Sequence, residues 1–306
     1  MDWKSHRIDA LLEQALIEDK AAGDATTNLI IDPELRATAS IVACQEMVVS
    51  GLGAIPRFLE IFARLDPRPP AQTRFEVISH PEMFDGVRAH PGQTLAIIRH
   101  NARVLLSCER VILNLIQHLS GIATLTRQYV DAIQGTHARI LDTRKTVPGL
   151  RTLDKYAVQC GGGTNHRIDL ASGILIKNNH ITLGGGLPTV LTRALEHRRK
   201  GQRIQVEVRT SEELEQALAY GAEAILLDNM PPAQVKQSVE RIHEKTNGAR
   251  AQDRPDQWIP TEASGGIVLS NIRAYAETGV DFISVGALTH SAKAANISMS
   301  ITPEPQ

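Results

Sequence analysis

From Arg139 onward, short apolar segments alternate with segments of helical pattern, and this alternation restricts the possible folds more than any other feature of the sequence. Several of the apolar segments do not alternate with polar residues, as expected for strands buried on both faces. Strands that alternate with helices predict a parallel sheet with crossover helices. The predicted strands are 140–141, 173–176, 204–208, 224–227, 259–263 and 282–285, and the predicted helices between them include 211–219, 232–244 and 270–278.

The chain before about residue 110 has a different, mixed α+β pattern. Apolar residues at helical spacing predict helices over 8–17 and 56–65, and β-rich stretches predict strands within 37–50, 75–80 and 93–100. A long amphipathic stretch follows, from Ala102 to Gln134, which we expect to be interrupted around Ser120-Gly121 and to connect two domains. The polar stretch 247–257, with glycine and proline, predicts a solvent loop.

Charge and cysteine content exclude several classes of protein. The 306 residues carry 33 Lys and Arg against 34 Asp and Glu, a net charge of −1, which gives no support for nucleic acid or a membrane as the main partner. The three scattered cysteines (Cys44, Cys108, Cys160) suggest neither a disulfide framework nor a zinc site. The charged N-terminal segment lacks the apolar core of a signal peptide, so we expect a cytoplasmic protein.

Polar residues and glycines follow or end the apolar segments of the second half. In a parallel α/β barrel the carboxyl ends of the strands converge on one face, where active sites form. An open doubly wound sheet would also gather these ends, along one edge. In strand order the residues concerned are Asp142 to Lys145, Lys177, Glu207, Asp228-Asn229, Ser264-Gly265-Gly266 and Gly286.

A set of cations in this region predicts a ligand with several carboxylates or phosphates. Clustering positive charges near a core is costly without anions, and arginine matches the geometry of carboxylate and phosphate groups. Taken one at a time, a cation of this kind is more often a surface residue or half of an ion pair. The set is Arg110, Arg144, Lys145, His166, Arg167 and Lys177.

Two carboxylates and two glycine turns complete the candidate site. Glu207 and Asp228 adjoin apolar segments and need partners, which could be sugar hydroxyls, Mg²⁺ with substrate phosphates, or structural ion pairs. The turn Ser264-Gly265-Gly266, followed by a helical pattern, offers backbone N–H groups to an anion. Gly286 follows the next strand, and the last two strand loops of barrels often bind phosphate.

Beyond these patterns, the chain resembles the quinolinate phosphoribosyltransferase family. The segment LDTRKTVPGLRTLDKYAVQCGGGTNHRIDLASGILIKNNHI, residues 141–181, is similar to the central signature of that family. The resemblance extends over nearly the whole chain, through EDKAAGDATTNLI, CERVILNLIQHLSGIATLT, VEVRTSEELEQALAYGAEAILLDNM and EASGGIVLSNIRAYAETGVDFISVGALTHSA. It implies a transferase of NAD biosynthesis that makes nicotinate mononucleotide from quinolinate and phosphoribosyl pyrophosphate, with loss of pyrophosphate and carbon dioxide.

The resemblance also implies an architecture and an assembly. It implies an N-terminal α/β sandwich domain over 1–115, completed by the tail 289–306, and an open α/β barrel of parallel strands over 116–288. It implies a homodimer, with a hexamer as the alternative, in which Arg110 of one subunit completes the site of the other.

Roles for the site residues come from the same resemblance. The cationic pocket for the dicarboxylate and the phosphoribosyl group would comprise Arg144, Arg167, Lys177, Lys145 and His166. Glu207 and Asp228 would lie near the ribose and Mg²⁺-pyrophosphate, with Lys145, Lys177, Glu207 and Asp228 as the catalytic set. The cradle for the 5-phosphate would comprise Ser264, Gly265, Gly266 and Gly286.

The sequence departs from the family pattern at a few places. Asn178 stands where the family often has an acidic residue, Thr164 occupies a variable position, and the loop 247–257 is longer than usual. Two alternatives remain at this stage: a family member acting on another acid, and a non-catalytic nucleotide-binding module on the same fold. The intact Arg144, Arg167 and Lys177 favour the dicarboxylate, and the presence of Glu207 and Asp228 favours an enzyme.

Overall fold

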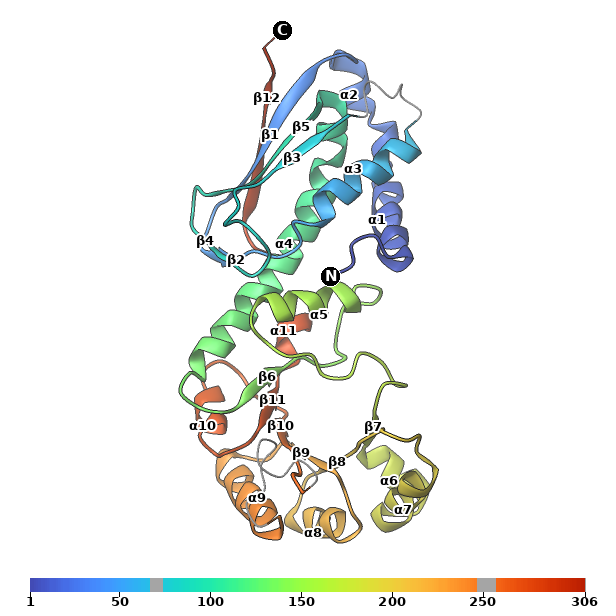
Figure 1. Cartoon of the computed structure of the whole chain (residues 1–306), viewed down its shortest axis with the longest axis vertical. Coiled ribbons are helices and arrows are strands. Elements are labelled where there is room, and N and C mark those ends of the chain that lie inside the picture. Colours follow the sequence, from blue (N-terminus) through green and yellow to red (C-terminus); the bar gives the residue numbers. More distant parts are fainter. Residues whose placement is uncertain (67–73, 247–256, 306) are drawn as a thin grey trace. The chain divides into compact units, whose positions relative to one another are not determined.

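The computed structural model of the chain describes residues 1–66, 74–246 and 257–305, in two compact units (Figure 1). The first unit contains 1–127, 147–162 and 292–306, and the second contains 128–146 and 163–291. The predicted domain boundary at 115/116 falls inside a single long helix, α4 (Ala102–Ala132), which continues into the second unit. The domain limits drawn from the sequence stay a prediction.

The first unit is built on a four-stranded antiparallel sheet in the order β12-β1-β5-β3 (Figure 1). Its strands are β1 (Arg36–Ala43), β3 (Glu76–Ile78), β5 (Thr94–Asn101) and β12 (Ile297–Pro303), while β2 (Met47–Val48) and β4 (Arg88–Ala89) form a separate pair. Along β1, every second residue is buried, because one face of the sheet covers the core and the other meets solvent.

Helices supply the rest of this unit's core. They are α1 (His6–Glu18), the short η1 (Ala21–Gly23), α2 (Ala25–Ile30), α3 (Ala54–Leu65), most of α4, and α5 (Arg151–Cys160). Buried side chains recur at helical spacing on α1 and α3, so each helix lays one apolar stripe on the core. The predicted helices 8–17 and 56–65 are confirmed.

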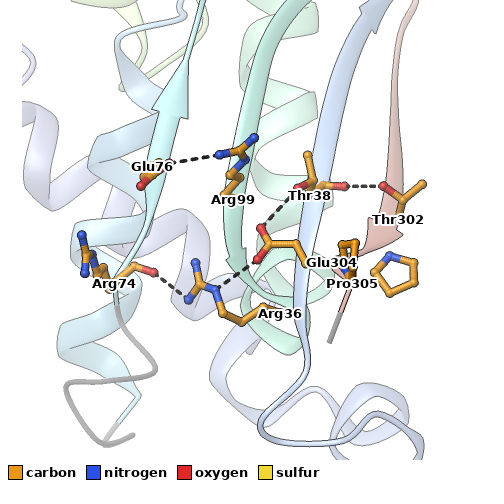
Figure 2. Close-up of a pocket in the computed structure, with 9 residues that line it drawn as sticks. Arg36, Thr38, Arg74, Glu76, Arg99, Thr302, Glu304 and Pro305 are labelled. Atoms are coloured by element: carbon orange, nitrogen blue, oxygen red, sulfur yellow. Dashed lines mark hydrogen bonds and ion pairs between the residues drawn. The ribbon is translucent and has the colours of Figure 1, made fainter.

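The solvent face of the sheet is polar, and two of its arginines lie near glutamates (Figure 2). Arg36 lies 3.4 Å from Glu304, and Arg99 lies 3.6 Å from Glu76 on the neighbouring strand. The hydroxyl of Thr38 donates to Glu304 at 3.3 Å. These contacts give Arg36 and Arg99 a counter-charge within the chain.

The expected interruption of α4 at Ser120-Gly121 is wrong, because the helix runs through it. A β-carbon at Gly121 would lie 2.1 Å from the carbonyl oxygen of Lys293, so the glycine allows a backbone to approach the helix closely. The hydroxyl of Ser120 accepts from the backbone N–H of Ser50 at 3.0 Å. The pair is therefore a packing position and not a helix break.

The second unit is a six-stranded parallel sheet in the order β6-β11-β10-β9-β8-β7. The strands are β6 (Arg139–Leu141), β7 (Ile174–Ile176), β8 (Ile204–Val208), β9 (Ala224–Asp228), β10 (Thr261–Ser264) and β11 (Phe282–Ser284). Around them lie α6 (Asn178–Gly184), α7 (Leu187–His197), α8 (Ser211–Ala219), α9 (Pro232–Lys245), α10 (Ile272–Ala276) and α11 (Ala287–His290). The predicted fold class, an N-terminal sheet domain with an open α/β barrel, is confirmed.

The barrel is open between β6 and β7, the two edge strands of the sheet. Next to β6, Thr164 forms a parallel bridge with Leu141, so the segment that carries His166 and Arg167 runs alongside the free edge. On the inner side, Gln205 of β8 donates to Glu262 of β10 at 2.7 Å, across the intervening strand β9. The predicted loop 247–257 lies outside the described residues except for Gln257.

Candidate active site

The register of the parallel strands brings the predicted polar residues to one end of the sheet. Ser264 pairs with both Asp228 and Ser284, and Ser284 pairs with Leu141. On the other side, Val208 pairs with Leu227. The residues that follow these positions therefore leave the sheet at its carboxyl end, as predicted (Figure 1).

The acidic pair lies between two cations. Lys177 Nζ is 3.6 Å from Glu207 Oε2, and Arg209 NH2 is 3.6 Å from Glu207 Oε1. Arg209 Nε is also 3.4 Å from Asp228 Oδ2, so one guanidinium bridges both carboxylates. Glu207 is buried, whereas Lys177 and Arg209 are about half exposed (49% and 47%).

The glycine turn after β10 packs against the turn after β9. Gly265 has φ +94°, and a β-carbon there would lie 2.3 Å from Asn229 Oδ1 and 3.0 Å from the Asn229 backbone nitrogen. Asn229 itself has φ +56°, and its backbone N–H donates to the carbonyl of Ser264 at 2.8 Å. Only glycine at 265 allows these two turns to meet next to Asp228.

Gly286, after β11, leaves room for a lysine. A β-carbon at this position would lie 3.1 Å from Cδ of Lys145 and 3.1 Å from Nε2 of His290. The hydroxyl of Thr289 donates to the carbonyl oxygen of Lys145 at 2.8 Å, which fixes the lysine backbone beside α11. The loops after β6 and β11 thus hold Lys145 and Gly286 together, as the predicted site requires.

Two arginines of the predicted set lie near each other without an acidic partner. Burial, together with the positive charge of Arg144, lowers the pKa of Arg167, and Asp169 only partly opposes this. Arg167 donates from NH1 to the carbonyl of Gly173 at 2.8 Å, and the buried Nε of Arg144 has no hydrogen-bond partner. No carboxylate of the described residues forms an ion pair with either guanidinium, so this position suits a bound anion.

His166 lies deeper, inside the barrel. Its Nε2 is 3.3 Å from Glu262 Oε2, and its Nδ1 accepts from the backbone N–H of Arg167 at 2.7 Å. His166 and Glu262 border a cavity of about 320 Å³, which Gln205 and Phe282 also line. The structure thus brings His166 next to Arg167 but commits both ring nitrogens to protein groups.

Arg110 belongs to the first unit, whereas the other predicted site residues belong to the second. It lies on α4, with its side chain 66% exposed and 3.4 Å from the carboxylate of its neighbour Glu109. Beside it is a groove of about 540 Å³ between α1 and α4, lined by apolar side chains that include Leu12, Phe58 and Leu115. Its predicted role across a dimer interface stays a prediction.

Comparison with protein families decides the family. A model described as the quinolinate phosphoribosyl transferase C-terminal domain matches residues 122–300, and one described as the N-terminal domain matches residues 24–120. The chain belongs to the quinolinate phosphoribosyltransferase family. The predicted family and the predicted enzyme class, a phosphoribosyltransferase, are confirmed.

Relatives of similar length support this assignment. The chain is 42% identical to a probable nicotinate-nucleotide pyrophosphorylase [carboxylating] of Bacillus subtilis (strain 168), covering 97% of this chain and 94% of that protein. It is 39% identical to a nicotinate-nucleotide pyrophosphorylase [carboxylating] of Mycobacterium leprae (strain TN), covering 95% of each. The crystal structure of NadC from Streptococcus pyogenes superposes with a TM-score of 0.87, at 34% identity over 100% of both chains.

Three residues at the candidate site were not predicted from the sequence. Arg209 directly follows β8. Lys177 was predicted as a site residue because it follows a strand, and the same rule, called the strand-end rule below, should also have found Arg209. Glu262 is a buried carboxylate within a strand, as Glu207 is, and the same reasoning should have found it too. Gln205 carries no comparable signal, because a neutral amide is unremarkable until its partner is known.

Metal binding by this family member was predicted at Glu207 and Asp228. Within the described ranges, no group of three or more His, Cys, Asp or Glu side chains could hold a metal ion. The two carboxylates that share Arg209 do fit an ion that keeps substrate phosphates among its ligands, which is the usual mode for Mg²⁺. No helix in the described part of the chain combines the length and apolar character needed to cross a bilayer.

Proposed function

We propose that this chain transfers the phosphoribosyl group of phosphoribosyl pyrophosphate to the ring nitrogen of quinolinate and then releases carbon dioxide, which gives nicotinate mononucleotide. The observation that carries the proposal is the pair Arg144 and Arg167, two partly buried guanidinium groups without an acidic partner among the described residues. Quinolinate carries two adjacent carboxylates, and two arginines match that charge and geometry.

The first step exchanges two bonds at the anomeric carbon. The lone pair of the pyridine nitrogen forms the new bond, and the electrons of the old C–O bond leave with pyrophosphate. Positive charge develops on the ribose, and the carboxylates of Glu207 and Asp228 are the groups that stabilise it. No side-chain base is required, because the pyridine nitrogen carries no proton to remove.

The leaving group needs positive charge. We propose that Glu207 and Asp228 would hold Mg²⁺ when substrate phosphates are bound, and that the ion would then supply positive charge for the leaving pyrophosphate. Lys145, held beside Gly286, and the turn Ser264-Gly265-Gly266 supply the ammonium and backbone N–H groups for the 5-phosphate. His166 was also predicted to bind substrate, but both of its ring nitrogens contact protein groups, so we propose that it acts through its neighbour Arg167.

The second step breaks the bond between the ring and one carboxyl group. The electron pair remains on the ring carbon next to the quaternary nitrogen, whose positive charge stabilises it, and a proton then replaces carbon dioxide. The ring itself accepts the electrons, so the protein contributes mainly orientation of the dicarboxylate.

One assay tests the function. Purified protein is incubated with phosphoribosyl pyrophosphate, Mg²⁺ and either quinolinate or nicotinic acid, and nicotinate mononucleotide is measured. We expect turnover of quinolinate and none of nicotinic acid, because nicotinic acid lacks the carboxylate that is lost. Equal turnover of the two acids would refute the assignment.

We further propose that the active unit is at least a dimer, a homodimer or a hexamer, in which Arg110 serves the partner's site. Two observations support this: the exposed Arg110 side chain pairs with its sequence neighbour Glu109, and an apolar groove lies beside it. Mixing Arg110→Ala chains with Lys177→Ala chains creates hybrid dimers with one intact site each. Random exchange should then restore about a quarter of wild-type activity.

The mixture is compared with each variant alone and with a mixture of Arg110→Ala and Arg241→Ala chains. Arg241 pairs with Glu215 on the surface of the second unit and controls for the loss of an arginine. If subunits demonstrably exchange and the mixture of Arg110→Ala with Lys177→Ala recovers no activity, Arg110 does not act across an interface. A cytoplasmic location stays a prediction from the sequence.

A further inference from the structure

A buried carboxylate that the proposed reaction does not use lies inside the barrel. Glu262 is 3% exposed and comes from β10, two residues before Ser264. A carboxylate so deeply buried is unfavourable unless several donors compensate for the lost water. Its partners therefore indicate what it does.

Two side chains from separate segments meet at Glu262. The amide of Gln205 donates to Oε2 at 2.7 Å, and Nε2 of His166 lies 3.3 Å from the same oxygen. Burial alone would raise the pKa of Glu262, but its interaction with His166, together with hydrogen bonds from Gln205 and Ser284, outweighs burial, so the pKa lies below its usual value. Glu262 is therefore an ionised acceptor inside the barrel at neutral pH.

The other side of the His166 ring is fixed as well. Nδ1 accepts from the backbone N–H of Arg167 at 2.7 Å, so this nitrogen carries no hydrogen and the proton belongs on Nε2, facing Glu262. The backbone N–H of His166 donates to the fully buried carboxylate of Asp142 at 2.8 Å. The orientation of the His166 ring is thus coupled to the position of the Arg167 backbone.

We propose that Glu262 is a positioning residue, which fixes the tautomer and the orientation of His166 and thereby holds Arg167 at the anion position. The order of contacts is Gln205 to Glu262, Glu262 to His166, and His166 to the backbone of Arg167. A carboxylate that orients a histidine in this way commonly affects a site that it does not touch. The inference deepens the proposed function, since Arg167 is a proposed ligand of quinolinate.

The test compares Glu262→Leu, which removes the acceptor, with Glu262→Gln, which keeps one. In Glu262→Leu we expect the Michaelis constant for quinolinate to rise about tenfold or more, by analogy with loss of the outer partner of a metal-bound histidine. The constant for phosphoribosyl pyrophosphate should stay within about twofold, because Ser264 and Gly286 are not held by His166. Glu262→Gln should recover most of the affinity for quinolinate.

A spectroscopic readout separates this inference from the function itself. Nitrogen-15 spectra of histidine-labelled protein, assigned through His166→Gln, report which ring nitrogen carries the proton. Wild type and Glu262→Gln should show the Nε2-protonated form at His166, and Glu262→Leu should lose it. Glu215→Gln, which alters a surface pair with Arg241, is the matched control and should change neither readout.

Either of two results would overturn the inference. One is a Glu262→Leu protein in which the His166 nitrogen shifts match wild type. The other is an equal rise of both Michaelis constants in Glu262→Gln, which would indicate a general structural defect. If the protein does not turn over quinolinate at all, the proposed function fails, while the nitrogen spectra still decide whether Glu262 positions His166.

Discussion

Arginines occur at both sheets of this protein, but the two groups differ in whether a carboxylate lies beside them. On the solvent face of the antiparallel sheet, Arg36 and Arg99 each have a glutamate within 4 Å (Figure 2). Beyond the carboxyl ends of the parallel sheet, Arg144 and Arg167 influence each other, and no carboxylate of the described residues lies within ion-pair distance of either. Paired arginines have their counter-charge within the chain, so the unpaired set is the one that indicates a ligand.

The largest effect should follow loss of an unpaired arginine. Arg144→Ala should weaken quinolinate binding by about 2–5 kcal/mol, the range for removing one partner of a buried charge pair. The unliganded protein should be no less stable, because the substitution removes a charge that Arg167 repels. Calorimetric titration with quinolinate and thermal unfolding without ligand measure the two effects. Unchanged affinity would place Arg144 outside the site.

An intermediate effect is expected where cations and carboxylates meet at the parallel strand ends. Arg209 neutralises Glu207 and Asp228, so Arg209→Ala should let the free protein bind a divalent ion more tightly. For a half-exposed pair we expect a gain of about 0.5–1 kcal/mol, measured as Mn²⁺ binding by electron paramagnetic resonance. Arg209→Lys keeps the charge and should bind Mn²⁺ as wild type does. If Arg209→Ala also binds as wild type does, Arg209 does not compete with metal.

The smallest effect should come from the antiparallel sheet. Glu304→Ala removes the partner of Arg36 and an acceptor of Thr38, both near the surface. Exposed pairs of this kind contribute about 0–1 kcal/mol to stability, so unfolding in urea should shift slightly and the Michaelis constants should not change. A clear loss of quinolinate affinity would mean that this sheet face takes part in the site, and would remove the contrast between the two regions.

Much of the fold could be predicted from local patterns. The strand 204–208 and the helix 211–219 were predicted with the bounds that β8 and α8 have, because an apolar segment and a capped helix start are local signals. Thr210, for example, accepts from the backbone of Glu213 and caps α8. Sequence patterns did not predict the helices η1, α2, α5, α6, α7 and α11.

The remaining features depend on contacts between distant segments. Ser120-Gly121 has the composition of a break, and only the backbone of Lys293 packed against it explains why the helix continues. In the site, the strand-end rule predicted that Lys177, Glu207 and Asp228 would meet, since it needs only the order of strands. It could not predict that Gln205 and His166 share Glu262, because that depends on the curvature of the barrel and on side-chain conformation.

Strand β12 has a consequence for synthesis of the protein. Its residues pair with β1 from Ala37 opposite Pro303 to Ala43 opposite Ile297, so the N-terminal sheet is complete only after the barrel has been translated. Until then, one edge of β1 has unpaired backbone N–H and C=O groups on the ribosome. An open strand edge invites pairing with other chains, so the nascent protein has a long period of aggregation risk that chaperones would have to cover.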